Sequence, residues 1–489
     1  MTKTGNQSLA ALAHKAIARR GSEPAVQFQG DWIRRSELSD LAGSILAHLQ
    51  ALALPAGSKI AFVARNHPSA LAAFVGLLAG GFSVRMIYPF QSSVGIAREI
   101  DMLRPAVVVA DHSIFSDELM AVLNSTGIGG LALAGMKLQP ITAATDRQFE
   151  AINPPVVEIL TSGTTGKPKP FTLTYDTIAI HFVGAPAPGL KTGNIPVLLY
   201  FPIGNISGLY STLPALLLGQ QIILLDRFRV EDWHAYIVKY RPVVSGMPPA
   251  GLQMVLDADI PPGDLSSLKM LGAGAAPLDP DVQRRFEQRY GIPILLSYGA
   301  TEFGGPVTRM TPELYENGGR EKIGSVGKAI PGFCLRVVHP ETYEPLSAGE
   351  EGILEVVSPR IGPDWIRTSD LAVIDDEGYL FHRGRADGAI VRGGFKILPE
   401  TIEKALLKHA QVSAVSVVGL KDARLGQVPV AAVVLKPGAE NVPVEALERH
   451  LREHVLATHI PVQWKIVEEL PRTALSFKVD QAAVRAMFG

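Results

Sequence analysis

The chain has 489 residues, of which 47% are hydrophobic and 19% are charged, and its formal net charge at pH 7 is −1. This length exceeds what one hydrophobic core usually holds, so at least two domains are expected. The near-neutral charge, without a basic block, argues against a nucleic-acid partner. The single cysteine, Cys334, excludes a disulfide within the chain and a thiolate metal cluster, and it favours a reducing cytoplasm.

Neither a signal peptide nor a transmembrane segment is expected. The N-terminal residues 1–7 lack an apolar core. Two uncharged stretches, 68–84 and 192–225, contain glycine or proline residues that a lipid-facing helix would tolerate poorly. We therefore expect both stretches to belong to a buried core.

The first third of the chain alternates patterns typical of strands and helices. Helical patterns in residues 8–50 surround a polar strand and turn at 25–32. Further elements are a helix at 68–81 and buried strands at 59–63, 82–88 and 106–110. Strands that alternate with helices indicate a parallel sheet with helices on its faces. Before residue 156, no pattern indicates chemistry.

An apolar strand at 156–160 leads into a loop of hydroxyl, glycine and lysine residues. Glycines let backbone N–H groups approach an anion, hydroxyls donate hydrogen bonds and lysines supply charge, which is typical of a phosphate site. Pro168 follows Lys167, so the loop differs from a Walker A motif and no helix is expected directly after it. For the string alone, a polar turn between two strands is the alternative. The loop residues are Thr161, Ser162, Gly163, Thr164, Thr165, Gly166, Lys167 and Lys169.

Later segments offer groups that suit a nucleotide and a metal ion. Residues 195–223 have the pattern of a strand, a loop at 201–209, a helix and a strand. Residues 268–278 form a strand that ends in small residues, where a flat ligand could lie against the backbone or a tight turn could form. Tyr298 offers an aromatic face, and Thr301 and Glu302 offer a hydroxyl and a carboxylate, the latter suited to Mg²⁺.

These strings resemble the motifs of the adenylate-forming superfamily, which includes acyl-CoA synthetases, amino-acid adenylation domains and beetle luciferases. The resemblance covers nearly the whole chain, most closely an acyl- or aryl-CoA ligase. It implies an α/β fold whose large N-terminal domain, residues 1–386, binds ATP and the acyl group. It also implies a hinge at Asp387 and a small mobile α+β domain, residues 387–489. The matching segments occur in the family's order, at 160–169, 298–302, 324–327, 368–370, 384–387, 392–397 and 471–473.

The resemblance also implies roles for individual residues. Besides the loop at 161–167, the ATP or AMP site would comprise Gly274, Ala275, Ala276, Tyr298, Gly299, Thr301, Asp370 and Arg385. The acyl pocket would comprise Asn205, Gly208, Gly272, Ala273, Gly299 and Gly304. The pantetheine channel would comprise Gly393 and Gly394. The catalytic residues would be Lys478, Thr301 and Glu302, with Glu302 as the metal ligand.

Three positions depart from the family pattern. Asn205 stands where a histidine is common, and Ser369 replaces a glycine. The lysine near the C-terminus, Lys478, lies one residue further from Pro471 than in relatives, and the usual glycine before it is missing. Asparagine does not titrate near neutral pH, so an acid–base role at position 205 is not expected.

The implied reaction joins a carboxylic acid to CoA in two steps, with ATP and Mg²⁺. An acyl-AMP and pyrophosphate form first, and the CoA thiol then takes the acyl group. The pocket candidates are uncharged and no arginine is evident among them, which favours an apolar fatty or aromatic acid. Two alternatives are open: loading of a carrier protein's pantetheine arm, and nucleotide binding without catalysis. A homodimer is also left open.

Overall fold

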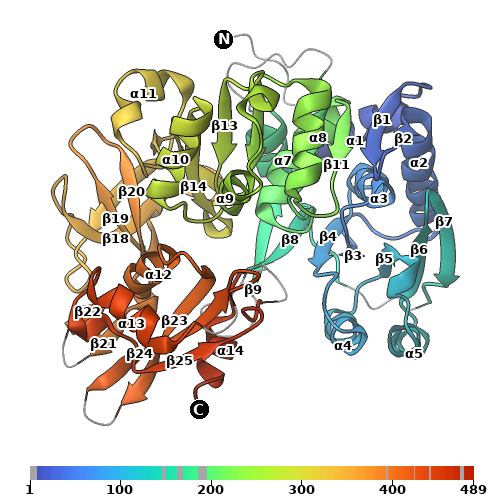
Figure 1. The fold of residues 1–489 in the computed structure, drawn as a ribbon. Helices are drawn as coiled ribbons and strands as arrows, with labels where there is room; N and C mark the ends of the chain where they lie inside the picture. Colours follow the sequence, from blue (N-terminus) through green and yellow to red (C-terminus); the bar gives the residue numbers. More distant parts are fainter. Residues whose placement is uncertain are drawn as a thin grey trace. The chain divides into compact units, whose positions relative to one another are not determined.

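The computed structural model describes residues 8–145, 150–161, 169–184, 195–392, 395–422, 425–439, 442–473 and 478–489 (Figure 1). The chain separates into two compact units. Unit 1 comprises residues 1–323 and 358–363, and unit 2 comprises residues 324–357 and 364–489. Since this division does not coincide with the expected boundary at residue 387, that boundary remains a prediction. Among the described helices, none has the length and apolar character needed to cross a bilayer.

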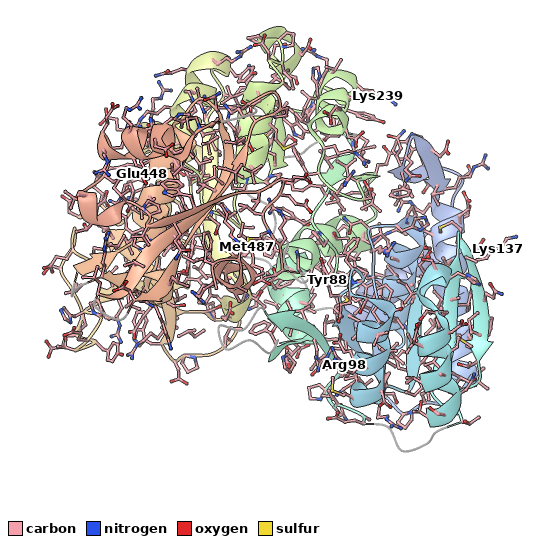
Figure 2. All side chains as sticks on the ribbon, turned by 60° about the horizontal axis from the view of Figure 1, so that its bottom comes forward. Tyr88, Arg98, Lys137, Lys239, Glu448 and Met487 are labelled. Carbon is pink, nitrogen blue, oxygen red and sulfur yellow. The ribbon has the colours of Figure 1, made fainter. Side chains whose placement is uncertain are left out.

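A seven-stranded sheet forms the first part of unit 1, with strand order β7-β6-β5-β3-β4-β8-β9. Its inner strands are parallel, whereas the β6–β7 and β8–β9 pairs are antiparallel. On the edge strand β7, Lys137 points outward, which disfavours pairing with another chain (Figure 2). The strands are β3 (Lys59–Val63), β4 (Ser83–Ile87), β5 (Val107–Asp111), β6 (Gly129–Ala134), β7 (Lys137–Thr142), β8 (Val156–Thr161) and β9 (Lys169–Thr174).

Helix α3 (Pro68–Ala79) lies in the core beside this sheet, and all its residues are buried. A helix that is apolar on every side must be covered on every side, which α1 (Leu9–Ala18) and α2 (Arg35–Ala51) help to achieve. At Gly76 a Cβ would lie 2.6 Å from the carbonyl oxygen of Ala42, so glycine permits the close approach of α2 and α3. The stretch from residue 68 is therefore protein core, as expected. Two further helices are α4 (Ser93–Leu103) and α5 (Asp117–Thr126).

A second sheet has the order β10-β11-β1-β2. Between β10 and β11 lies helix α7 (Ile206–Leu218), so the predicted loop at 201–209 is wrong in its second half. The helix begins there because Asn205 caps it, with its side-chain oxygen accepting a hydrogen bond from the Gly208 N–H at 2.7 Å. The strands are β1 (Pro24–Phe28), β2 (Asp31–Arg34), β10 (Val197–Leu199) and β11 (Ile222–Leu224).

The third sheet supplies the elements that carry most candidate site residues of unit 1. Strands β12 (Val244–Met247), β13 (Met270–Ala273) and β14 (Ile294–Ala300) are parallel, and β15 (Gly305–Arg309) returns antiparallel to β14. The remaining helices of unit 1 are α6 (Tyr175–Ile178), α8 (Val230–Tyr240), α9 (Pro249–Asp257), α10 (Pro280–Tyr290) and α11 (Pro312–Glu316).

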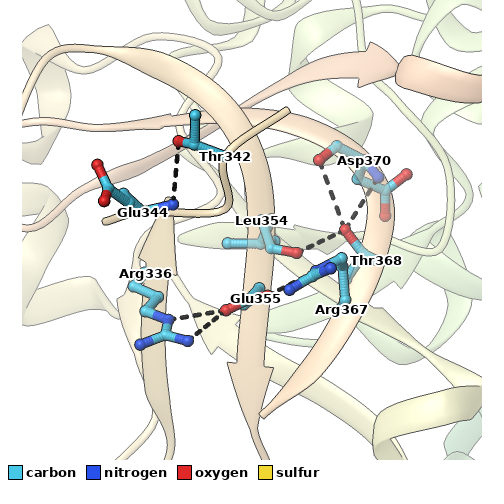
Figure 3. Close-up of polar contacts among 8 residues, drawn as sticks. All are labelled: Arg336, Thr342, Glu344, Leu354, Glu355, Arg367, Thr368 and Asp370. Atoms are coloured by element: carbon cyan, nitrogen blue, oxygen red, sulfur yellow. Dashed lines mark hydrogen bonds and ion pairs between the residues drawn. The ribbon is translucent and has the colours of Figure 1, made fainter. Parts of the chain in front are cut away.

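Unit 2 begins with an antiparallel sheet in the order β17-β18-β19-β20, which the sequence had not predicted. Glu355 on this sheet is 2% exposed and forms ion pairs with Arg336 and Arg367, each at 2.7 Å (Figure 3). Burial alone would raise the pKa of this carboxyl, but the hydrogen bonds and charges of the two arginines lower it. The strands are β17 (Cys334–Val338), β18 (Glu351–Val357), β19 (Ile366–Ile374) and β20 (Leu380–Arg385).

The C-terminal part of unit 2 is the expected small α+β structure. Its sheet has the order β22-β21-β24-β23, and β25 pairs parallel with β24. It has a core of its own, in which Leu406 of α12 and Leu451 of α13 are fully buried. The fold class is thus confirmed. The elements are β21 (Ile390–Arg392), β22 (Phe395–Ile397), α12 (Pro399–Leu407), β23 (Val412–Asp422), β24 (Gly426–Leu435), α13 (Val444–Arg452), β25 (Gln463–Ile466) and α14 (Gln481–Ala486).

Candidate ATP and acyl site

Strands β8 and β9 bring the two ends of the predicted phosphate loop together. Thr161, the last residue of β8, is the cross-strand partner of Lys169, the first residue of β9. A strand therefore follows the loop, and the prediction that no helix follows it directly is confirmed. The other predicted loop residues, Ser162, Gly163, Thr164, Thr165, Gly166 and Lys167, lie outside the described residues.

A buried ion pair fixes the strand that enters this loop. On β8, Glu158 Oε2 lies 3.0 Å from Arg85 Nε and 4.0 Å from Lys59 Nζ. The three side chains are only 7–12% exposed, and Lys59 also bonds Glu150. A buried carboxylate is tolerated when opposite charges surround it, so β3 and β4 hold β8 in place three residues before the loop.

The carboxyl end of β13 lies beside the first half of β14, because Ala273, the last residue of β13, is the parallel partner of Leu296. A Cβ on Gly274 would lie 2.5 Å from Ser297 Oγ, so this turn packs directly against β14. Ala275 has a φ of +68° and, like Ala276, is exposed. The structure thus brings the small-residue turn next to Ser297 of β14, the residue before Tyr298 and Gly299, as an adenine site between them would require.

A short helical turn, Thr301–Phe303, follows β14 and presents two predicted catalytic residues. The Tyr298 N–H donates to Thr308 Oγ1 at 3.1 Å, which ties the end of β14 to β15. Beyond it, the Glu302 side chain is exposed to solvent. An exposed carboxylate suits Mg²⁺, which prefers to keep several waters alongside one or two carboxylates and phosphate oxygens.

The glycines predicted to leave room for the acyl group fall into two classes. A Cβ on Gly208 would lie 1.8 Å from the Pro202 carbonyl oxygen, and one on Gly299 would lie 2.4 Å from the Gly305 carbonyl oxygen. Close backbone packing therefore explains these two glycines. At Gly272, by contrast, the nearest atom to such a Cβ is Ser245 O at 3.9 Å, an ordinary van der Waals distance, so a methyl group fits there without a clash.

An arginine lies beside the acyl-pocket candidates, contrary to the expectation from the sequence. Arg360 is buried, and its Nη1 donates to the carbonyl oxygens of Gly304 at 3.2 Å and Pro306 at 2.8 Å. Ser358 Oγ also donates to Phe303 O at 2.8 Å. Sequence reasoning missed Arg360 because it lies 54 and 56 residues from its two partners and no local pattern marks it.

In unit 2, the two residues predicted to bind ribose are cross-strand partners. Asp370 on β19 lies opposite Arg385 on β20. Thr368 Oγ1 donates to Leu354 O at 2.8 Å and accepts from the Asp370 N–H at 2.9 Å, at an irregularity in the β18–β19 pairing (Figure 3). His382 Nε2 lies 3.4 Å from Asp370 Oδ1, a neighbour that the motif comparison had not included.

The remaining candidates of unit 2 lie on turns. Asp387 is the middle residue of the turn Ala386–Gly388, directly after β20. Lys478 is exposed, and its carbonyl oxygen accepts a hydrogen bond from the Thr473 N–H at 2.8 Å. Gly393 and Gly394, the predicted pantetheine-channel residues, lie outside the part of the chain that the structure describes.

Two sequence-family models match the chain. One, described as an AMP-binding enzyme, matches residues 13–363, and one described as an AMP-binding enzyme C-terminal domain matches residues 401–476. Similar proteins include a long-chain-fatty-acid–CoA ligase of Bacillus subtilis (strain 168), 25% identical over 96% of this chain and 93% of its own length. An indoleacetate–CoA ligase of Aromatoleum aromaticum is 30% identical over 68% of this chain and 67% of its own.

Solved structures share the fold. The o-succinylbenzoate CoA synthetase of Bacillus subtilis, in complex with an acyl-adenylate intermediate, superposes with a TM-score of 0.79. That match covers 98% of both chains at 22% sequence identity. A 2-succinylbenzoate–CoA ligase of Bacillus pumilus is 26% identical over 95% of both sequences.

Proposed function

The chain belongs to the family of AMP-binding enzymes and is an AMP-forming acid–thiol ligase, and from this premise we propose that it joins a fatty or aromatic acid to CoA. ATP, Mg²⁺, CoA and a small carboxylic acid are the reactants and cofactors of this class. The observation that carries the proposal is the packing of the Gly274–Ala276 turn against Ser297 of β14, with Tyr298 and Glu302 following along the chain.

In the proposed first step, a carboxylate oxygen attacks the α-phosphate of ATP and pyrophosphate leaves. Tyr298 stacks on the adenine, whose other side lies against the turn from Gly274 to Ala276. Asp370 accepts hydrogen bonds from the ribose hydroxyls, and Arg385 lies opposite it on the neighbouring strand. These contacts hold the α-phosphate near the acid, so positioning supplies much of the rate.

Charge neutralisation supplies the rest. Backbone N–H groups and hydroxyls of the 161–169 loop bind the leaving pyrophosphate, and Thr301 donates to the α-phosphate. Glu302 would hold Mg²⁺, which offsets phosphate charge when bound. The Lys478 ammonium contacts both the reacting carboxylate and the α-phosphate, and stabilises the charge that develops between them.

In the second step, the CoA thiol attacks the acyl carbon and AMP leaves with the bonding electrons. No enzyme nucleophile is required, because AMP is already a good leaving group. We propose that the domain after Asp387 rotates between the steps, withdraws Lys478 and brings Gly393 and Gly394 to the pantetheine channel. The 387–489 boundary belongs to this proposal. A cytoplasmic location and a homodimer are likewise predictions.

The choice of acid rests on the pocket candidates and on the relatives. Gly272 has no atom closer than 3.9 Å to the position of a Cβ, which is compatible with an acyl group beside it. The similar proteins are named as ligases of long-chain fatty acids, indoleacetate and 2-succinylbenzoate. A fatty or aromatic acid is therefore proposed rather than an amino acid.

The test is AMP release by the full chain, with ATP and Mg²⁺, over short, long and aromatic acids. We expect release that depends on both the acid and CoA. Pyrophosphate release that needs a carrier protein in place of CoA would favour carrier loading, and ATP binding without pyrophosphate release would favour the non-catalytic alternative.

The role of Lys478 is tested by Lys478→Ala, with Lys465→Ala as a matched control because both lysines are exposed. We expect adenylation to fall by about a hundredfold or more in the first variant only, the usual effect of removing one transition-state donor. Full acyl-AMP formation by Lys478→Ala would show that the assignment is wrong.

A further inference from the structure

Two arginines contact Tyr210 of α7 in unit 1, and a histidine lies near one of them. The Arg360 guanidinium lies over the tyrosine ring, with its carbon 5.6 Å from the ring centroid. Arg309 Nη2 donates to the Tyr210 hydroxyl at 3.4 Å. His181 is close enough to Arg360 for the arginine charge to lower the histidine pKa. The cluster of Arg360, Arg309 and His181 thus places two guanidinium groups at one aromatic ring, with an imidazole near Arg360.

This cluster borders the region predicted to hold the acyl group. A Cβ on Gly305 would lie 3.5 Å from Arg360 Nη1, 3.6 Å from Tyr210 Cδ2 and 3.9 Å from Ile206 Cγ1. Gly305 follows Gly304, a predicted pocket residue, and Ile206 follows Asn205, another. Arg360 and the pocket candidates therefore lie together at the start of α7 and the turn between β14 and β15.

The electrostatics of the cluster favour an anion. Burial lowers the pKa of Arg360, and the Arg309 charge lowers it further, against an opposing effect of Tyr210. Burial and the Arg360 charge both lower the pKa of His181, so the imidazole is neutral near pH 7. Two guanidinium charges close together in a partly desolvated region are unfavourable, and a bound anion would relieve their repulsion.

A purely structural role for Arg360 explains only part of this arrangement. Its two bonds to the Gly304 and Pro306 carbonyl oxygens hold the turn after β14, and both use Nη1. Holding backbone carbonyls does not require a second arginine nearby. Nor does it explain why Arg309 approaches the same tyrosine. A binding role accounts for both arginines together.

We propose that Arg360, assisted by Arg309, binds a second anionic group on the acid substrate, remote from the carboxylate that reacts. This inference rests on the proposed ligase function and refines its substrate class to fatty or aromatic acids with a second carboxylate. The planar guanidinium matches a carboxylate through paired hydrogen bonds, which explains an arginine rather than a lysine here. Tyr210 and Ile206 provide apolar contacts for the carbon skeleton.

The first experiment measures equilibrium binding of matched acids to the unmodified full chain by calorimetry. The probes are meta-carboxyphenylpropanoic acid, its methyl ester at the ring carboxylate, dodecanedioic acid and its monomethyl ester. We expect at least one diacid to bind about tenfold or more tightly than its ester, as charge-assisted hydrogen bonds imply. Equal or tighter binding of both esters would overturn the inference.

Variants locate the effect. Arg360→Met and Arg309→Met should each reduce the diacid-to-ester affinity ratio by about tenfold. The second variant serves if the first does not fold, because Arg360 also holds the backbone of the turn. Arg289→Met is the control, since Arg289 also lies over a tyrosine ring, 5.3 Å from its centroid, but on α10 outside the cluster. An unchanged ratio in both Arg360→Met and Arg309→Met would refute the assignment.

CoA-dependent AMP release with the same acids separates this inference from the ligase proposal. AMP release with the esters, without tighter binding of the diacids, would support the ligase function and refute the anion site. Preferred binding of a diacid without AMP release from any acid would support the anion site and argue against the ligase function.

Discussion

Two glycine-to-alanine substitutions provide a direct test of the pocket geometry. At Gly208 the new Cβ would lie 1.8 Å from Pro202 O, about 1.6 Å short of the 3.4 Å at which ordinary contact begins. Such overpacking costs about 1–3 kcal/mol or more and exceeds the roughly 1 kcal/mol that alanine gains over glycine in a helix. Gly208→Ala should therefore lower the free energy of unfolding.

Gly272→Ala should behave differently, because the nearest atom to its Cβ is 3.9 Å away. Its stability should stay within about 0.5 kcal/mol of the wild type or rise slightly, since alanine restricts the unfolded chain. The added methyl would occupy space proposed for the acyl group. One methyl group in a pocket changes discrimination by about tenfold or more, so kcat/KM should fall most for the bulkiest acids.

Thermal unfolding and AMP release over acids of increasing size measure both effects on the two variants. Equal destabilisation by the two substitutions would contradict the clash-free position of a Cβ at Gly272. A stable Gly272→Ala enzyme with an unchanged size preference would show instead that this residue does not face the acyl group.

Three further predictions concern stability. Burial raises the pKa of Glu403 to about 7. The stability that this raised pKa contributes to the folded state is therefore fully present below the unfolded pKa of about 4.5 and is lost as pH rises through 7. Between pH 5 and 8 the free energy of unfolding of Glu403→Gln should therefore rise relative to that of the wild type, by at most about 3 kcal/mol, as measured by thermal melts. A difference that does not change with pH would contradict this. Asn205→Ala should lose about 1 kcal/mol of unfolding free energy in denaturant melts and Asn205→Asp much less, because aspartate keeps the helix cap; equal losses would refute the cap. Arg85→Met should lower the free energy of unfolding by about 3 kcal/mol, and adding Glu158→Gln should restore part of this loss. If the losses of the two single variants simply add in the double variant, their ion pair does not stabilise the fold.

The sequence predicted most of the parallel framework but not the antiparallel sheet β17-β18-β19-β20. Strand β3 coincides with the predicted 59–63, and β4 and β5 differ from prediction by one or two residues, because each is a short apolar run between turns. The four strands from β17 to β20 were missed. Their pattern is interrupted by charged residues such as Arg336, Glu355 and Arg367, which are accommodated only because they pair across neighbouring strands.

The candidate site was predictable where a single segment carries the chemistry. The turn after β13 and the end of β14 are recognisable in the sequence, and the structure brings them together because adjacent parallel strands end at the same edge. Arg360 was not predictable, since its partners on α7 and after β14 come from distant segments. The helix cap formed by Asn205 was also missed, because the residue was considered only as a replacement for the family's histidine, although asparagine is common at helix N-termini.

The ion cluster around Glu355 has a consequence for the order in which its residues can change during evolution. If Glu355 were replaced first, Arg336 and Arg367 would be left as neighbouring like charges on the sheet. If either arginine were replaced first, the carboxylate would keep one partner. Substitution histories in relatives should therefore begin at an arginine and reach the acid last, and the three positions should covary.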